Sequence, residues 1–146
     1  MREIHIDKII NTVRKLCIDA NYYLSEDIRQ RFEEARDSEG FPTAQNIIDI
    51  LIENADIAEK EQRPMCQDTG MAVVFVEIGQ EVHIVGGSLE DAINQGVRQG
   101  YEEGYLRKSV VSDPLERINT KDNTPAVIYY DIVPGDGFKI TVAPKG

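Results

Sequence analysis

Apolar and polar residues alternate through the first sixty positions with the 3.6-residue period of amphipathic helices. This pattern predicts three helices: residues 5–23, from an N-cap at Ser25 to about Arg36, and from an N-cap at Thr43 to about Gln62. The third should end there because Pro64 disfavours helical geometry at the residue before it. Its predicted apolar face contains Ile47, Ile48, Leu51, Ala55 and Ala58. Cys17 lies on the apolar stripe of the first helix, so we expect it to be a small buried hydrophobe.

The pattern then changes to that of strands. The nearly continuous apolar run Met71–Ile78 predicts a strand covered on both faces, and Gly79–Gln80 could turn into a second strand, Val82–Val85. Ser88 and Asp91 resemble a capping box that opens a helix from Leu89 to about Leu106. Residues 108–124 are polar and irregular, and two more strands are predicted at 126–133 and 138–143. The expected fold is α+β: N-terminal helices, then a mixed or antiparallel sheet with one long packing helix, in a single domain of residues 1–146.

Three glycines recur on one face of the predicted fourth helix: Gly96, Gly100 and Gly104. Each glycine inside a helix costs about 1 kcal/mol relative to alanine, so a close approach by another element should offset that cost. Tight internal packing is the simpler interpretation. The alternative is a non-catalytic interaction module that docks a partner through this face.

Composition narrows the classes of function. The formal net charge of −10 argues against nucleic acid as a partner, because such proteins normally present a basic face. No stretch approaches the roughly 18 apolar residues of a membrane span, and no apolar signal-peptide core follows Met1. Two cysteines are too few for a disulfide framework, so the cytoplasm is the expected location.

The densest group of reactive side chains lies between the third helix and the first long strand. It reads Arg63–Pro64–Met65–Cys66–Gln67–Asp68–Thr69–Gly70. A loop at such a junction often presents functional groups. A purely structural loop would need only a cap and a turn, which the last three of these residues would supply. The string by itself leaves both interpretations open.

Three chemical interpretations of this loop compete. The Asp68–Thr69–Gly70 string occurs in aspartic proteases, but those place it after a strand of an all-β fold, and here a helix precedes it. Cys66 could be a nucleophile with a histidine base, for which only His5 and His83 are present. Cys66 could also be an iron ligand, although one cysteine cannot hold a cluster without further ligands.

The order of several short motifs decides among these interpretations. The loop from Cys66 to Gly70 and the apolar strand after it resemble the class I, iron–sulfur-dependent fumarate hydratases and the related tartrate dehydratases. The resemblance spans essentially the whole chain. Its other motifs are Gly86–Gly87 before a helix, Tyr105–Leu106–Arg107–Lys108–Ser109, Asn119–Thr120 with Pro125–Ala126, and Ala143–Pro144–Lys145–Gly146. The last motif is similar to the start of that family's Lys–Gly–Gly–Gly–Ser loop.

The resemblance implies a hydro-lyase of four-carbon dicarboxylates, of the kind that serves the tricarboxylic acid cycle, and a role for each matching residue. Cys66 matches one of three cysteines that hold a 4Fe–4S cluster. Gln67 and Asp68 match residues that contact the dicarboxylate, with Asp68 the candidate acid for the hydroxyl. Arg107 matches an arginine that binds a substrate carboxylate; its position alone would suggest a surface ion pair at a helix end. Gly146 matches the start of a loop whose backbone N–H groups approach the substrate.

The resemblance also implies what this chain lacks. Two of the three cluster cysteines are absent, and Cys17 matches neither. We therefore expect an N-terminal fragment of an α subunit, one that neither holds a stable cluster nor turns over substrate alone. Its expected partners are a β subunit or C-terminal domain, a second α region in a homodimer, and the dicarboxylate. Fumarate and L-tartrate are not distinguished by these residues.

Overall fold

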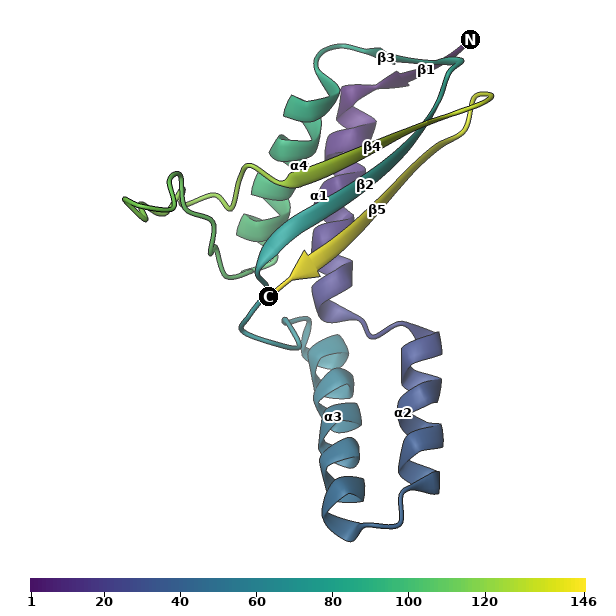
Figure 1. Ribbon diagram of the computed structural model, residues 1–146, viewed down its shortest axis with the longest axis vertical. Coiled ribbons are helices and arrows are strands. Elements are labelled where there is room, and N and C mark those ends of the chain that lie inside the picture. The colour runs from purple at the N-terminus through teal and green to yellow at the C-terminus, as the bar shows by residue number, and fades with distance from the viewer.

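The chain contains four helices and five strands. They follow one another in the order that the sequence predicts, with one further strand at the N-terminus. The computed structural model describes all residues from Met1 to Gly146 (Figure 1). The elements are β1 (Arg2–His5), α1 (Ile6–Tyr22), α2 (Glu26–Ser38), α3 (Pro42–Glu61), β2 (Met71–Gly79), β3 (Val82–Val85), α4 (Leu89–Glu103), β4 (Val127–Val133) and β5 (Phe138–Lys145). The predicted α+β class is confirmed, and the boundaries of the predicted elements agree to within three residues.

Helices α1 and α4 pack against each other through the glycine face of α4. A Cβ placed on Gly96 would lie 2.7 Å from Val13 Cβ, and one on Gly100 would lie 2.8 Å from the Arg14 carbonyl oxygen. Gly104 follows the last helical residue as the C-cap, with the side chain of Ile18 close by. The interpretation as tight internal packing is confirmed: α1 covers this face, so it offers no surface to a partner.

The three-stranded sheet has the order β4-β2-β5, with β2 parallel to β4 and antiparallel to β5. One of its faces lies across α1 and α4 (Figure 1), and there Ala72, Val74 and Val76 are fully buried. The prediction that β2 is covered on both faces is wrong. Met71 and Phe75 point to the other side and are exposed, where the Phe75 ring stacks on that of Tyr129 at 5.3 Å between centroids.

A second sheet contains only β1 and β3, which pair in parallel with Glu3 opposite His83. The sequence pattern did not indicate β1, because four residues are too few to show a period. Residues 80 and 81 do form a turn after β2, but β3 does not pair with β2. Instead, β3 pairs with the N-terminal strand β1, and β5 is the strand that pairs with β2.

Helices α2 and α3 form a hairpin that projects away from the sheet (Figure 1). Ser25 is the N-cap of α2 as predicted, but its side chain makes no capping hydrogen bond. The expected cap of α3 at Thr43 is wrong: the N-cap is Phe41, and Pro42 occupies the first helical position, where its missing N–H costs nothing. Of the predicted apolar face, Ala55 and Ala58 are buried, while Ile47 and Leu51 stay about half exposed. None of the four helices combines the length and apolar character that crossing a bilayer requires.

Candidate functional site

The loop between α3 and β2 is held at both ends. Gln62 ends α3 in the left-handed conformation. The Met65 N–H then donates to the Asn21 carbonyl of α1 at 2.9 Å, and the Met65 carbonyl accepts from the Asn54 side chain of α3, also at 2.9 Å. The next residue, Cys66, is exposed, and its Sγ accepts from the Asp68 N–H at 3.3 Å. The loop thus presents the thiol to solvent from a fixed backbone.

Thr69 and Gly70 anchor the far end of the loop, where β2 begins. The Thr69 hydroxyl, which is buried, donates to the Arg107 carbonyl at 2.9 Å, and its own carbonyl accepts from the Tyr101 hydroxyl at 3.0 Å. Gly70 has φ +55°, and a Cβ there would lie 1.6 Å from the Lys145 carbonyl oxygen. Only glycine fits this crossing of β5 over the loop.

Asn123 joins the loop to the segment that follows Arg107. Its side chain is 0% exposed. The amide nitrogen donates to the Gly70 carbonyl at 2.9 Å, and the amide oxygen accepts from the N–H groups of Ser109 and Val110 at 2.7 and 3.1 Å. Sequence reasoning missed this residue, because an asparagine inside the polar stretch 108–124 gives no sign of burial.

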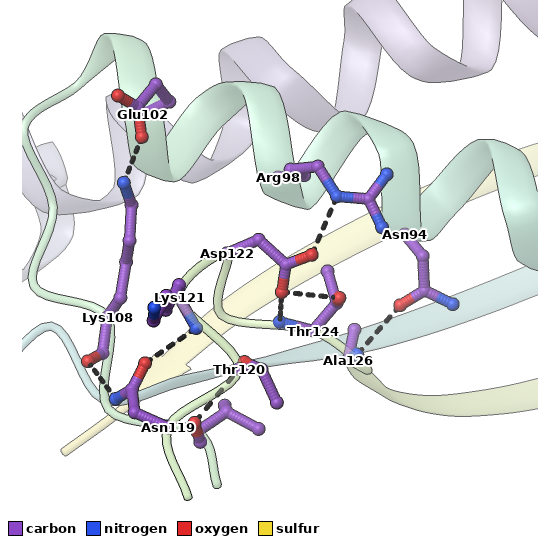
Figure 2. Close-up of polar contacts among 11 residues, drawn as sticks. Asn94, Arg98, Glu102, Lys108, Asn119, Thr120, Lys121, Asp122, Thr124 and Ala126 are labelled. Atoms are coloured by element: carbon purple, nitrogen blue, oxygen red, sulfur yellow. Dashed lines mark hydrogen bonds and ion pairs between the residues drawn. The ribbon is translucent and has the colours of Figure 1, made fainter. Parts of the chain in front are cut away.

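Polar contacts hold the irregular 108–124 segment against α4. Figure 2 shows the Asn119 side chain donating to the Lys108 carbonyl at 2.9 Å, next to Arg107, while Lys108 forms an ion pair with Glu102 of α4. Farther along, Asp122 accepts from the Arg98 side chain of α4 at 2.8 Å (Figure 2). Burial raises the pKa of Asp122, but its bonds to Arg98 and Thr124 outweigh this and lower the pKa to about 2. The segment that follows Arg107, residues 108–124, is therefore well anchored, although it forms no helix or long strand.

A pocket of about 460 Å³ opens between this loop and the end of α4. Three of the predicted site residues line it together: Cys66, Gln67 and Arg107. The other lining residues are Arg63, Pro64, Met65, Thr69 and Tyr105. The sequence motif included Tyr105, but no role was assigned to it. Two arginines and a neutral amide around one pocket suit an anionic ligand that accepts several hydrogen bonds.

Asp68 and Gly146 lie together beside the pocket rather than on its wall. A Cβ added to Gly146 would be 2.9 Å from Asp68 Oδ2, so the backbone at the end of β5 runs directly past this carboxylate. The two residues are 78 positions apart in the chain. The antiparallel pairing of β2 with β5 brings them together, since Met71 lies opposite Lys145.

The interpretation of Cys66 as a nucleophile needs a histidine base close to the thiol. The pocket contains no histidine. His5 caps the other end of α1, a helix of 17 residues, so it is about 25 Å from the loop along the helix axis. Cys17 is buried against α4, and burial raises the pKa of its thiol to about 12. It is an inert core residue, as predicted, whereas Cys66 is exposed.

The pocket offers one cysteine ligand for a metal cluster, Cys66. Cys66 is the single thiol at the pocket, and nowhere do three His, Cys, Asp or Glu side chains come together as a metal site. A cluster held by cysteines would need ligands beyond those of residues 1–146.

Comparison with known proteins identifies the family. The family model described as fumarate hydratase (Fumerase) matches residues 10–146. The chain belongs to the fumarate hydratase family. It is 35% identical over 131 residues to the aerobic class I fumarate hydratase of Escherichia coli K12, an alignment that covers 88% of this chain and 24% of that enzyme.

Relatives named as L(+)-tartrate dehydratase α subunits also match this chain. A Methanocaldococcus jannaschii protein with a provisional name as an L(+)-tartrate dehydratase α subunit is 39% identical over 117 residues, which cover 80% of this chain and 41% of that protein. The L(+)-tartrate dehydratase α subunit of Escherichia coli UTI89 is 26% identical over 97% of this chain and 47% of its own length. The chain thus spans less than half the length of each of these relatives.

Proposed function

We propose that this chain provides the substrate-facing loop of a hydro-lyase that adds water to, or removes water from, a four-carbon dicarboxylate. The substrates would be fumarate, hydrated to L-malate, or L-tartrate, dehydrated. Membership of the family supports the class of reaction. The arrangement of this chain's own residues supports the proposal. Cys66, Gln67 and Arg107 line one pocket, and Asp68 and Gly146 lie beside it.

Each residue has a distinct part in the proposed reaction. The Arg107 guanidinium binds one substrate carboxylate through two parallel hydrogen bonds, which fixes the orientation of the molecule. The Gln67 amide donates to a substrate oxygen. Asp68 gives its proton to the departing hydroxyl, which leaves as water, and takes one back from water in the direction of hydration. The backbone N–H of Gly146, next to Asp68, approaches the same end of the substrate.

The base that removes the proton from the neighbouring carbon lies outside this chain in this proposal, in a β subunit or C-terminal domain. Cys66 would hold one iron of a 4Fe–4S cluster, with the remaining cysteine ligands also supplied from outside residues 1–146. When bound, a cluster with one open iron position supplies Lewis acidity toward the carboxylate and hydroxyl oxygens of the substrate. The exposed Cys66 thiol at the pocket supports this assignment.

The test is anaerobic reconstitution, with iron and sulfide, of the complete gene product together with its β partner. Hydration of fumarate and dehydration of L-tartrate are then measured on the wild type, on Cys66→Ser and on the matched control Cys17→Ala. We expect Cys66→Ser to lose the brown colour of the cluster and the activity together, while Cys17→Ala keeps both. A Cys66→Ser enzyme with full cluster content and activity would refute the assignment of the ligand. A wild type inactive toward both substrates would refute the proposed function.

A further inference from the structure

Tyr105 occupies a left-handed backbone position at a helix end, which glycine fills most often. Helix α4 ends at Glu103, and Tyr105 follows with φ +51°. The Leu106 N–H donates to the Tyr101 carbonyl at 3.0 Å, and the Tyr105 N–H donates to the Glu102 carbonyl at 3.3 Å. These two bonds define a Schellman motif, in which the left-handed residue is usually glycine. A tyrosine there is strained, because its Cβ crowds the following carbonyl.

The Tyr105 side chain makes no buried contact or hydrogen bond within the chain that would offset this strain. The turn itself is anchored by the next residue, Leu106, which is buried in the core. The side chain of Tyr105 is 88% exposed, and no hydrogen bond of its hydroxyl is found. Glycine would therefore form the same turn with less strain and without loss of a core contact. A requirement for the tyrosine side chain itself explains its presence best.

Tyr105 is one of the residues that line the pocket together with Cys66, Gln67 and Arg107. Its phenol is a neutral hydrogen-bond donor two residues away from a guanidinium, and a carboxylate accepts readily from both. We propose that Tyr105 is a substrate-binding residue, whose hydroxyl donates to the dicarboxylate at the end held by Arg107. This inference rests on the proposed function and adds to it a residue that determines affinity.

The experiment compares three variants. Tyr105→Phe keeps the ring and the strain but removes the donor. Tyr105→Gly removes the strain and the side chain, and Tyr105→Asn has no ring but tolerates the left-handed conformation. KM and kcat are measured on the reconstituted enzyme with its β partner, and Tm is measured on the chain itself. A separate readout needs no cluster: L-malate or L-tartrate should protect the exposed Cys66 thiol of the chain from iodoacetamide, with buried Cys17 as the internal control.

We expect Tyr105→Phe to raise KM about tenfold at unchanged Tm, the effect of losing one hydrogen bond to a charged group. Tyr105→Gly should raise KM at least as much while it raises Tm by about 2–4 °C. Tyr105→Asn should raise KM without a fall in Tm. In the labelling assay, all three variants should need about tenfold more dicarboxylate for the same protection.

Three results would overturn the inference. Wild-type KM and wild-type protection in Tyr105→Phe and Tyr105→Gly would show that the side chain does not contact the substrate, while the proposed function still stands. A fall in Tm in Tyr105→Gly would show that the tyrosine packs structurally. Loss of binding to the β partner, at an unchanged KM in the assembled fraction, would make Tyr105 an interface residue. Failure of the proposed function is recognised separately, by an inactive wild type whose Cys66 is nevertheless protected by dicarboxylate in a Tyr105-dependent way.

Discussion

Replacement of Gly100 by alanine tests the closest approach between α1 and α4. The new Cβ would lie 2.8 Å from the Arg14 carbonyl oxygen and 2.8 Å from Cys17 Cβ. Carbon atoms in contact are usually about 3.5–4.0 Å apart. Both neighbours are fixed, one being backbone and the other the first side-chain atom of a helical residue. The helices would therefore have to separate by several tenths of an ångström along the whole contact.

Two effects of opposite sign decide the result. Alanine is the better helix former by about 1 kcal/mol, which stabilises α4. Overpacking in a well-packed core costs about 1–3 kcal/mol. The upper half of that range applies here, because Val13, Ile93 and Val97 on the same contact are 0% exposed and lose contacts when the helices separate. The net expectation is a loss of about 1–2 kcal/mol in the free energy of unfolding, or about 3–8 °C in Tm.

Thermal and urea unfolding followed by circular dichroism measures this difference. Gly40→Ala is the matched control, since a Cβ there meets nothing within 4 Å, and its Tm should stay close to that of the wild type. A Gly100→Ala protein as stable as the wild type, or more stable, would show that helix propensity outweighs the contact. The reasoning that these glycines exist for close helix packing would then be refuted.

Three further predictions concern the site and its supporting loop. Asn123→Ala should lower the free energy of unfolding by about 2–4 kcal/mol, because it leaves the Gly70 carbonyl and the N–H groups of Ser109 and Val110 without their hydrogen-bond partner. A loss below 1 kcal/mol in urea unfolding would contradict the bridging role. Iodoacetamide at pH 8 should modify Cys66 at least 100 times faster than Cys17, whose burial raises its pKa to about 12; equal rates by mass spectrometry would place Cys17 outside the core. The pKa of Asp122 is lowered to about 2, so its stabilising effect is complete above about pH 4 and is lost as the pH falls toward 2. The Tm difference between the wild type and Asp122→Asn should therefore shrink between pH 5 and pH 2, and a constant difference would count against the Arg98 contact.

The elements whose structure depends on nearby residues could be predicted from the sequence. The helical period placed α1 and identified Cys17 as a core residue, because one face of a helix is defined by residues three and four apart. The Ser88 cap follows from the same local logic, since its hydroxyl accepts from the Asp91 N–H. The loop from Cys66 to Gly70 was recognised because its residues are contiguous.

Only the tertiary structure decided which distant segments meet. It paired β1 with β3 and left one face of β2 open. It brought Gly146 to Asp68, and it buried Asn123 between two parts of the site. Such contacts join residues tens of positions apart, and no periodicity within one segment records them. The sequence thus determined the helices, the central strands and the chemistry of one loop, and the packing of the whole chain determined which side chains surround that loop.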